Sequence, residues 1–120
     1  MPRAKRGPKA RRRRNKVLKL ASGYRGAKSK LFRTAQEAVD KGLQYAYKDR
    51  RLKKRDFRAL WITRIGNAVK LAGLSYNRFI NGLNRSEILL DRKVLSDMAI
   101  SDSLGFGKLI EVAKNALAKA

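Results

Sequence analysis

The feature that most constrains the fold of this chain is a long stretch without proline. Both prolines, Pro2 and Pro8, lie in the first eight residues, and only Gly42 and Gly66 interrupt residues 27–72. Alanine, glutamine, lysine, arginine and leucine predominate in that stretch, and all of them favour helices. Because proline is the strongest helix breaker, the sequence predicts one very long helix over residues 27–72, with any kink at Gly42 or Gly66.

A shorter helix is predicted over residues 10–21, ahead of the long one. Residues 22–26 read Ser-Gly-Tyr-Arg-Gly, and glycines on both sides of Tyr24 and Arg25 favour a turn there. We therefore expect the two helices to be separated by this turn.

Three short helices are predicted after the long one. Gly73 is placed to end the long helix, Ser75 to cap the next, Asp91 to cap another, and Asp102 or Ser103 to cap the last. Apolar residues three and four apart give each helix one apolar stripe. The stripes are Tyr76, Phe79, Ile80 and Leu83; Val94, Leu95, Met98 and Ala99; and Phe106, Leu109, Ile110, Ala113 and Leu117, all expected to pack on Trp61, Ile62, Ile65 and Val69. The predicted fold class is all-α: a long basic N-terminal helical extension followed by a small C-terminal helical bundle.

Charge divides the chain in the same way as the apolar residues do. The sequence has 31 Lys and Arg against 9 Asp and Glu, a net charge of +22. Residues 1–60 carry 22 basic and 4 acidic residues, a net +18, whereas residues 61–120 carry 9 and 5, a net +4. We expect a basic extension over residues 1–59 and a small globular helical domain over residues 60–120. A chain so charged repels itself unless an anionic partner neutralises it, and nucleic acid is the densest such partner.

The densest basic segment lies between Lys48 and Arg58, where seven basic residues stand against two aspartates. At 100 degrees per residue the seven cover an arc of about 220 degrees, and Leu52, Asp49 and Asp56 fall in the gap. A solvated helix with i,i+4 ion pairs is the ordinary explanation of such a run. Two acids cannot pair seven bases, so the arrangement favours a helix held in a crevice of folded nucleic acid.

The composition excludes several other classes of protein. No cysteine and no histidine are present, so disulfides, thiolate metal sites and the commonest general base are absent. The carboxylates form no paired constellation; no catalytic residue, metal site or cofactor is predicted, and the chain is not expected to be an enzyme. The N-terminus has no apolar segment after its charges, so it does not read as a secretory signal, and a cytoplasmic location is expected. We expect no membrane partner and no small-molecule substrate.

Two binding alternatives to RNA remain open from composition alone. A DNA-compacting protein would share the charge, although such proteins usually dimerise through a large apolar interface, and none is evident. A membrane-active basic helix would need an apolar face, which residues 48–58 lack. Aromatic residues interleaved with the charge favour RNA, because rings stack on unpaired bases. Tyr24, in its glycine-flanked turn, is the best stacking candidate.

Four segments of the sequence resemble the bacterial large-subunit ribosomal protein twenty (L-twenty) family. They are RGPKARRRRNKVLKLASGYRGAKSKLFRTAQEAV, QYAYKDRRLKKRDFRALWITRI, SYNRFINGL and DRKVLSDMAI, within a match from about Pro2 to Leu117. The resemblance implies a structural constituent of the large ribosomal subunit that binds ribosomal RNA directly and acts early in assembly. It also implies neighbouring ribosomal proteins as partners, and the chain's own messenger RNA as a further candidate, since some members repress their own translation.

Contact with RNA is expected mainly in the basic extension, with a second site in the C-terminal domain implied by the resemblance. The expected residues of the extension are Arg3, Lys5, Arg6, Lys9, Arg11, Arg12, Arg13, Arg14, Lys16, Lys19, Tyr24, Arg25, Lys28, Lys30, Arg33, Lys48, Arg50, Arg51, Lys53, Lys54, Arg55 and Arg58. Those of the second site are Arg78, Arg92 and Lys93.

Overall fold

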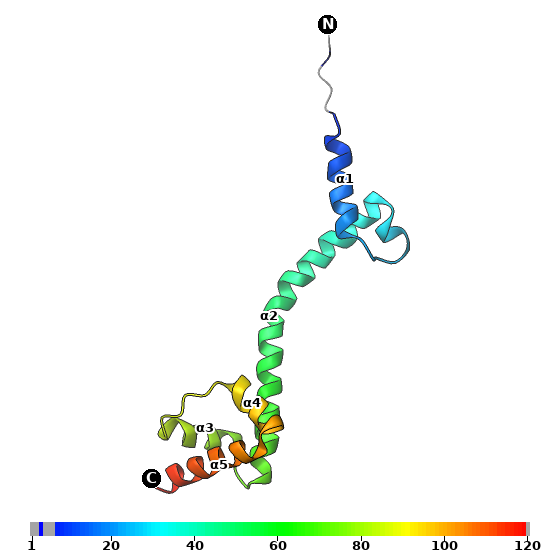
Figure 1. Cartoon of the computed structure of the whole chain (residues 1–120). Helices are drawn as coiled ribbons and strands as arrows, with labels where there is room; N and C mark the ends of the chain where they lie inside the picture. The colour runs from blue at the N-terminus through cyan, green and yellow to red at the C-terminus, as the bar shows by residue number, and fades with distance from the viewer. Residues whose placement is uncertain (1–2, 4–6, 120) are drawn as a thin grey trace. The chain divides into compact units, whose positions relative to one another are not determined.

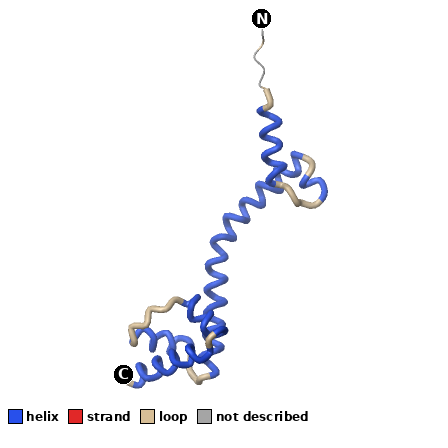
Figure 2. Tube along the Cα trace, in the orientation of Figure 1, coloured by secondary structure: helices blue, strands red, loops and turns tan. Residues whose placement is uncertain are grey.

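The structure is a computed structural model that describes residue 3 and residues 7–119. These residues form helices α1 (Lys9–Leu20), α2 (Phe32–Leu71), α3 (Tyr76–Arg85), α4 (Arg92–Ser101) and α5 (Ser103–Ala118), with a 3-10 helix, η1 (Gly26–Ser29). No strand occurs in this described part of the chain (Figures 1 and 2). The all-α prediction, with a long basic helical extension and a smaller C-terminal helical region, is confirmed.

The chain forms two compact units, and the boundary between them falls inside α2, after Arg51. The first unit contains α1, η1 and the beginning of α2. Its small core consists of Ala21, Ala35 and Val39, with Val17 and Leu18 partly buried against them. These contacts pack the end of α1 on the start of α2, and the sequence analysis did not predict them.

The long helix begins five residues later than predicted. Gly26 has a φ of +64°, a conformation that residues with a Cβ rarely adopt, and it is the first residue of η1. The Ser29 hydroxyl donates a hydrogen bond to the Gly26 carbonyl at 3.0 Å, which closes this tight turn. Because the chain turns there, α2 starts only at Phe32, and the predicted start at residue 27 was wrong. The predicted break at residues 22–26 is confirmed.

The predicted helix caps of the second unit are confirmed. Gly73, with a φ of +79°, follows the end of α2. Ser75, Asp91 and Asp102 precede α3, α4 and α5, and their side chains accept hydrogen bonds from backbone N–H groups three residues on. Between Asp102 and Ser103, the two alternatives for α5, the cap is Asp102. Each cap satisfies an N–H that has no partner within the helix.

The core of the second unit gathers residues from all four of its helices. Its buried members are Ile65, Val69, Phe79, Leu83, Leu95, Phe106, Ile110 and Ala113. The rings of Phe79 and Phe106 lie 5.5 Å apart between centroids, so the aromatic contact joins α3 to α5. The stripes predicted for α3 and α5 therefore face the core as expected, although Tyr76, Ile80 and Leu109 are only partly buried against it. Leu117 is also only partly buried.

The stripe predicted for α4 was partly wrong. Val94 is 41% exposed, whereas Leu95 and Ser96 are buried. The other three residues of the stripe do face the core: Leu95 is buried, and Met98 and Ala99 are partly buried against it. Only Val94 was placed wrongly, and the buried Ser96 was missed. Trp61 and Ile62, which were expected in the core, are only partly buried.

Candidate nucleic-acid interface

Helix α1 presents its cations in every direction. Its sequence, KARRRRNKVLKL, contains no acidic residue, and none of its twelve side chains is buried. The predicted RNA-contacting residues of this helix are all exposed: Lys9, Arg11, Arg12, Arg13, Arg14, Lys16 and Lys19. Arg3 is exposed as well, whereas Lys5 and Arg6 lie outside the described residues. A helix with this surface can neutralise phosphates on more than one side at once.

Arg14 also contacts the beginning of α2. Its guanidinium carbon lies 5.8 Å from the centre of the Phe32 ring, a cation–π distance. Phe32 is therefore a packing residue of the first unit. The contact also holds the last turns of α1 against α2, together with the small core described above.

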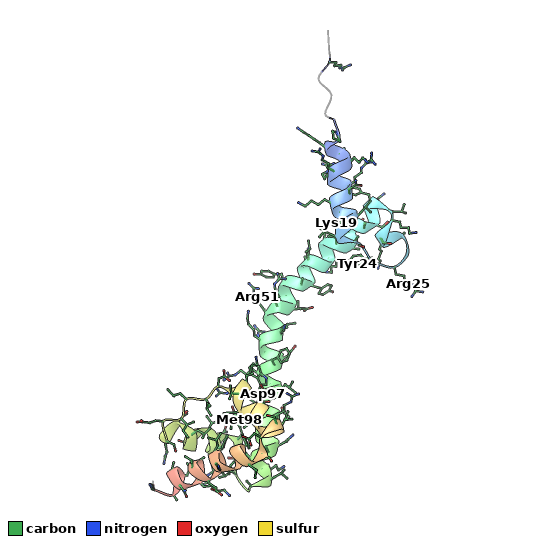
Figure 3. All side chains as sticks on the ribbon, viewed as in Figure 1. Lys19, Tyr24, Arg25, Arg51, Asp97 and Met98 are labelled. Carbon is green, nitrogen blue, oxygen red and sulfur yellow. The ribbon has the colours of Figure 1, made fainter. Side chains whose placement is uncertain are left out.

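The turn after α1 brings together several of the predicted residues. Tyr24 and Arg25 lie in the turn, and Lys28 lies in η1. These three line an open hollow of about 410 Å³, together with Lys41 and Tyr45 from α2. Figure 3 shows Tyr24 beside the helix and Arg25 on the outside of the turn. Lys30 and Arg33, predicted as well, are exposed just beyond η1.

The basic segment of α2 is helical throughout, as the wheel of residues 48–58 assumes. Its seven predicted cations are all exposed, namely Lys48, Arg50, Arg51, Lys53, Lys54, Arg55 and Arg58. Leu52, in the gap of the arc, is partly buried, whereas Asp49 and Asp56 are exposed.

Several cations of α2 lie over aromatic rings of the same helix. Arg51 lies 3.8 Å from the ring centre of Tyr47, and its Nη1 donates to the Tyr47 carbonyl at 3.5 Å. Lys53 lies 6.0 Å from the ring of Phe57, four residues on. Side chains four apart are neighbours on a helix, so these pairs follow from the sequence, although the sequence analysis did not identify them. The rings of this segment are thus partly covered by their own helix.

The second predicted site lies at the starts of α3 and α4. Arg78 and Lys93 are exposed, but Arg92 is partly buried, and its Nε donates a hydrogen bond of 2.8 Å to Tyr76 Oη. This bond ties the first turn of α4 to the first turn of α3. Arg92 therefore has a structural contact that sequence reasoning missed, because the two residues are sixteen positions apart.

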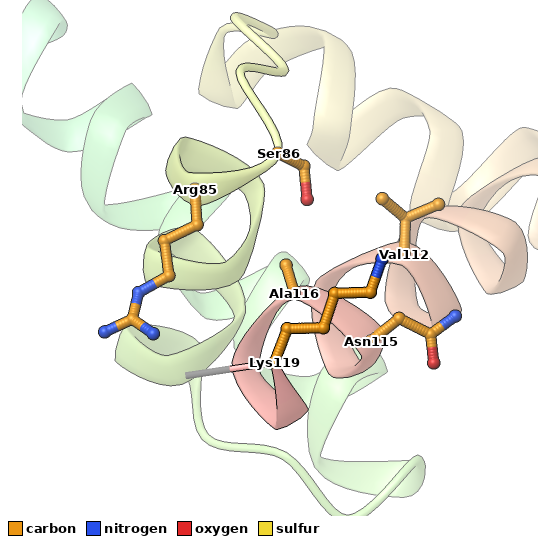
Figure 4. A pocket seen from close by; sticks show the side chains of 6 residues that line it. All are labelled: Arg85, Ser86, Val112, Asn115, Ala116 and Lys119. Atoms are coloured by element: carbon orange, nitrogen blue, oxygen red, sulfur yellow. The ribbon is translucent and has the colours of Figure 1, made fainter.

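Two further cations line a hollow of about 370 Å³ between α3 and α5. Figure 4 shows Arg85 on the α3 side and Lys119 with Asn115 on the α5 side. Arg85 Nε donates to Asn81 Oδ1 at 3.2 Å. Neither Arg85 nor Lys119 was predicted as a site residue, since each is an isolated cation in the sequence.

Residue 3 and residues 7–119 contain no group of three or more acidic, histidine or cysteine side chains placed to hold a metal ion. Within the same residues, no helix has both the length and the apolar character needed to span a membrane.

Comparison with known proteins assigns this basic helical chain to a family. Residues 3–109 match the family described as ribosomal protein L20. The large ribosomal subunit protein bL20 of Geobacter metallireducens is 66% identical over 114 residues, which cover 95% of this chain and 97% of that protein. The bL20 proteins of Geotalea daltonii and Geobacter sulfurreducens are 62% and 64% identical, with the same coverage. The resemblance is confirmed: the chain belongs to the ribosomal protein L20 family.

Proposed function

We propose that this protein is a structural constituent of the large ribosomal subunit, in the cytoplasm, and that it binds ribosomal RNA directly and helps early subunit assembly. Its relatives are named as proteins of the large ribosomal subunit. Membership of a ribosomal protein family also agrees with the expectation that the chain is not an enzyme. Neighbouring ribosomal proteins are further proposed partners.

The observation that carries the proposal is the exposure of the basic residues. Every predicted cation that the structure describes in the N-terminal half is exposed, from Arg3 to Arg58. Residues 1–60 hold a net charge of +18, which repels itself when the protein is free in solution without an anionic partner. Ribosomal RNA supplies closely spaced phosphates on several sides of an inserted helix. We therefore assign phosphate contact to these exposed cations, with Arg78, Arg92 and Lys93 as a second RNA-binding site.

Salt dependence tests this proposal directly. Phosphate contacts release condensed counterions, so the logarithm of the binding constant should fall linearly and steeply with the logarithm of salt concentration. For 6–10 phosphate contacts the affinity should drop by about 10³- to 10⁵-fold between 50 and 200 mM salt. A nearly flat dependence would contradict the proposal. Competition at physiological salt between large-subunit ribosomal RNA and duplex DNA separates it from a DNA-compacting role.

We also propose that residues 60–120 are the self-supporting domain and that residues 1–59 form the extension. The larger core begins at Ile65, whereas the core of the first unit consists of three buried apolar residues among those that the structure describes. The fragment 60–120 should therefore show a cooperative thermal transition by circular dichroism. The fragment 1–59 should gain helix when ribosomal RNA is added, and strong helicity without RNA would contradict folding on binding.

Repression of the protein's own messenger RNA is a finer proposal, and the resemblance is its only support. The cations of the second unit, including Arg78 and Lys93, would make the contact. A translational reporter that carries the natural leader should then be repressed by residues 60–120 alone. Unchanged reporter expression would reject this role and leave ribosomal binding unaffected.

A further inference from the structure

The open hollow beside the turn after α1 combines aromatic rings with positive charge. Its lining includes Tyr24 and Tyr45 together with Arg25, Lys28 and Lys41, and it contains no carboxylate. All of these residues belong to the first unit. Tyr24 is 37% exposed and Tyr45 is 51% exposed, so burial in a core does not account for either ring.

A glycine of α2 makes room for the Tyr24 ring. A Cβ on Gly42 would lie 3.1 Å from Tyr24 Oη, closer than an ordinary van der Waals contact. Glycine weakens a helix interior relative to alanine, but at this position of α2 it leaves room for the Tyr24 hydroxyl. The ring is positioned against the helix backbone instead of projecting freely from the turn.

The backbone of the turn places Arg25 and Lys28 at the same hollow as Tyr24. Gly23 and Gly26 have φ values of +86° and +64°, and Arg25 between them is extended, with φ −78° and ψ 134°. This backbone leads the chain around Tyr24 and into η1, which carries Lys28. Lys41 lies one residue before Gly42 on α2, and its Nζ is 5.0 Å from the centre of the Tyr45 ring. Since Lys41 covers Tyr45, Tyr24 is the ring left to stack on a ligand.

The dimensions and chemistry of the hollow suit one nucleotide. A volume of about 410 Å³ lies within the range of about 300–1,000 Å³ that small-ligand pockets have. Aromatic rings stack on unpaired bases of single-stranded RNA, and arginine and lysine bind phosphate. A site of this kind distinguishes a nucleotide with a base from bare sugar-phosphate backbone. Among the exposed cations of α1, Arg14 lies 5.8 Å from the centre of the Phe32 ring, but that ring is partly buried.

We infer that this hollow holds one unpaired nucleotide of the bound RNA, with its base stacked on Tyr24 and its phosphate among Arg25, Lys28 and Lys41. The inference rests on the proposed function, because it names a subsite within the proposed RNA interface. It adds a base-dependent contact to binding that the other cations make through phosphates. It also adds Lys41 to the RNA-contacting residues that the sequence analysis predicted.

The test compares two synthetic single-stranded RNA 12-mers of equal charge, oligouridine and its abasic counterpart, each binding to the full-length protein. Tyr24→Leu removes the ring and should weaken oligouridine binding by about 5- to 100-fold, the loss typical when a stacking ring is removed. Gly42→Ala only crowds the Tyr24 hydroxyl, so its loss of oligouridine binding should be smaller than that of Tyr24→Leu. Both variants should leave abasic binding within about twofold. Gly66→Ala is the matched control, because its Cβ would meet nothing closer than 3.9 Å. It should change neither affinity.

Two outcomes overturn the inference. Equal losses for both oligonucleotides would mean that Tyr24 supports the fold of the turn only, and no loss for either would mean that the ring is not part of the interface. Binding of wild-type protein to large-subunit ribosomal RNA is measured in parallel. If binding to ribosomal RNA is salt-sensitive but Tyr24→Leu has no effect, the nucleotide-binding role of the hollow is rejected and the proposed function is retained. If the protein does not bind ribosomal RNA, both proposals are rejected.

Discussion

Gly82 of α3 packs directly on Ala113 of α5, with no space for a side chain between them. A Cβ on Gly82 would lie 2.6 Å from the carbonyl oxygen of Ala113 and 2.8 Å from its Cα and Cβ. Both residues are buried, and the Phe79–Phe106 contact joins the same two helices. Because Gly82 meets backbone atoms, a rotamer change in its neighbour cannot make room.

We predict that Gly82→Ala destabilises the protein. The added methyl must push α3 from α5, and overpacking of this kind costs about 1–3 kcal/mol. The gain in helix propensity, about 1 kcal/mol, offsets only part of this cost. The measurement is the midpoint of chemical denaturation, followed by circular dichroism.

Gly107→Ala is the matched control for that prediction. Gly107 lies in α5, and a Cβ there would meet nothing within 4 Å. This substitution should raise the free energy of unfolding by up to about 1 kcal/mol. If both glycine variants shifted the midpoint upward, the close approach of α3 to α5 would be refuted.

The second prediction concerns Ser96, which is fully buried in α4 and whose hydroxyl has no hydrogen-bond partner among the residues that the structure describes. A buried polar group without a partner costs about 1–3 kcal/mol. Ser96→Ala should therefore leave the free energy of unfolding unchanged or increase it by about 1 kcal/mol, with added help from the helix propensity of alanine. Thermal unfolding measures the change.

Ser101→Ala serves as the comparison for Ser96. The Ser101 hydroxyl is exposed and donates to the Asp97 carbonyl at 2.7 Å, so its removal should have an effect below about 0.5 kcal/mol. Destabilisation of the Ser96→Ala variant by 1 kcal/mol or more would show that the Ser96 hydroxyl is hydrogen-bonded in solution.

The third prediction separates two roles of Arg92. The hydrogen bond from Arg92 Nε to Tyr76 Oη links α4 to α3, and the same residue is a proposed RNA contact. Tyr76→Phe removes the acceptor and should cost about 0.5–1.5 kcal/mol of stability. At a permissive temperature it should leave affinity for ribosomal RNA within about twofold.

A double-mutant cycle with Arg92→Gln completes that test. If the hydrogen bond is the main coupling, the stability loss of the double variant should be smaller than the sum of the single losses by about 0.5–1.5 kcal/mol. Additive losses would mean that the two side chains do not interact in solution. Of the two single variants, only Arg92→Gln should lower the affinity for RNA, because it removes a charge from the interface.

The sequence predicted the helices of the second unit well because its caps and apolar spacing are local signals. The side chains of Ser75 and Asp91 accept hydrogen bonds from the backbone N–H groups three residues on, as expected for helix caps. The orientation of α4 was less predictable, since Val94, Leu95 and Ser96 differ by 100 degrees each around the helix. Such a prediction assumes that apolar residues are buried and polar residues are exposed, whereas here Ser96 is buried and Val94 is exposed.

The contacts that the sequence did not reveal in the first unit are non-local or depend on small residues. Ala21, Ala35 and Val39 form its core, yet alanine contributes little to an apolar pattern. The approach of Tyr24 to Gly42 joins positions eighteen residues apart through a turn whose path needs two glycines at positive φ. Propensity alone indicates that a turn exists but not what the turn touches. The exposed cations, by contrast, could be predicted from charge because the 22 basic residues of positions 1–60 far outnumber the 4 acidic ones.

The last prediction concerns the basic arc of α2. Arg55 lies within the arc and is exposed, so Arg55→Gln should weaken binding to ribosomal RNA and reduce the slope of log K against log salt by about 0.7–0.9. The effect should be similar for RNAs of different sequence, because a phosphate contact reads no bases. Filter binding at four or more salt concentrations measures the slope.

Asp49→Asn is the control that removes a charge of the opposite sign with almost no change in side-chain size. Asp49 is exposed in the gap of the arc, where no phosphate is expected, so the substitution should leave the slope unchanged and raise affinity slightly through long-range charge alone. If Arg55→Gln and Asp49→Asn changed the slope equally, the arc would have no defined contact face. The net charge of the segment, and not the arrangement of its side chains, would then determine binding.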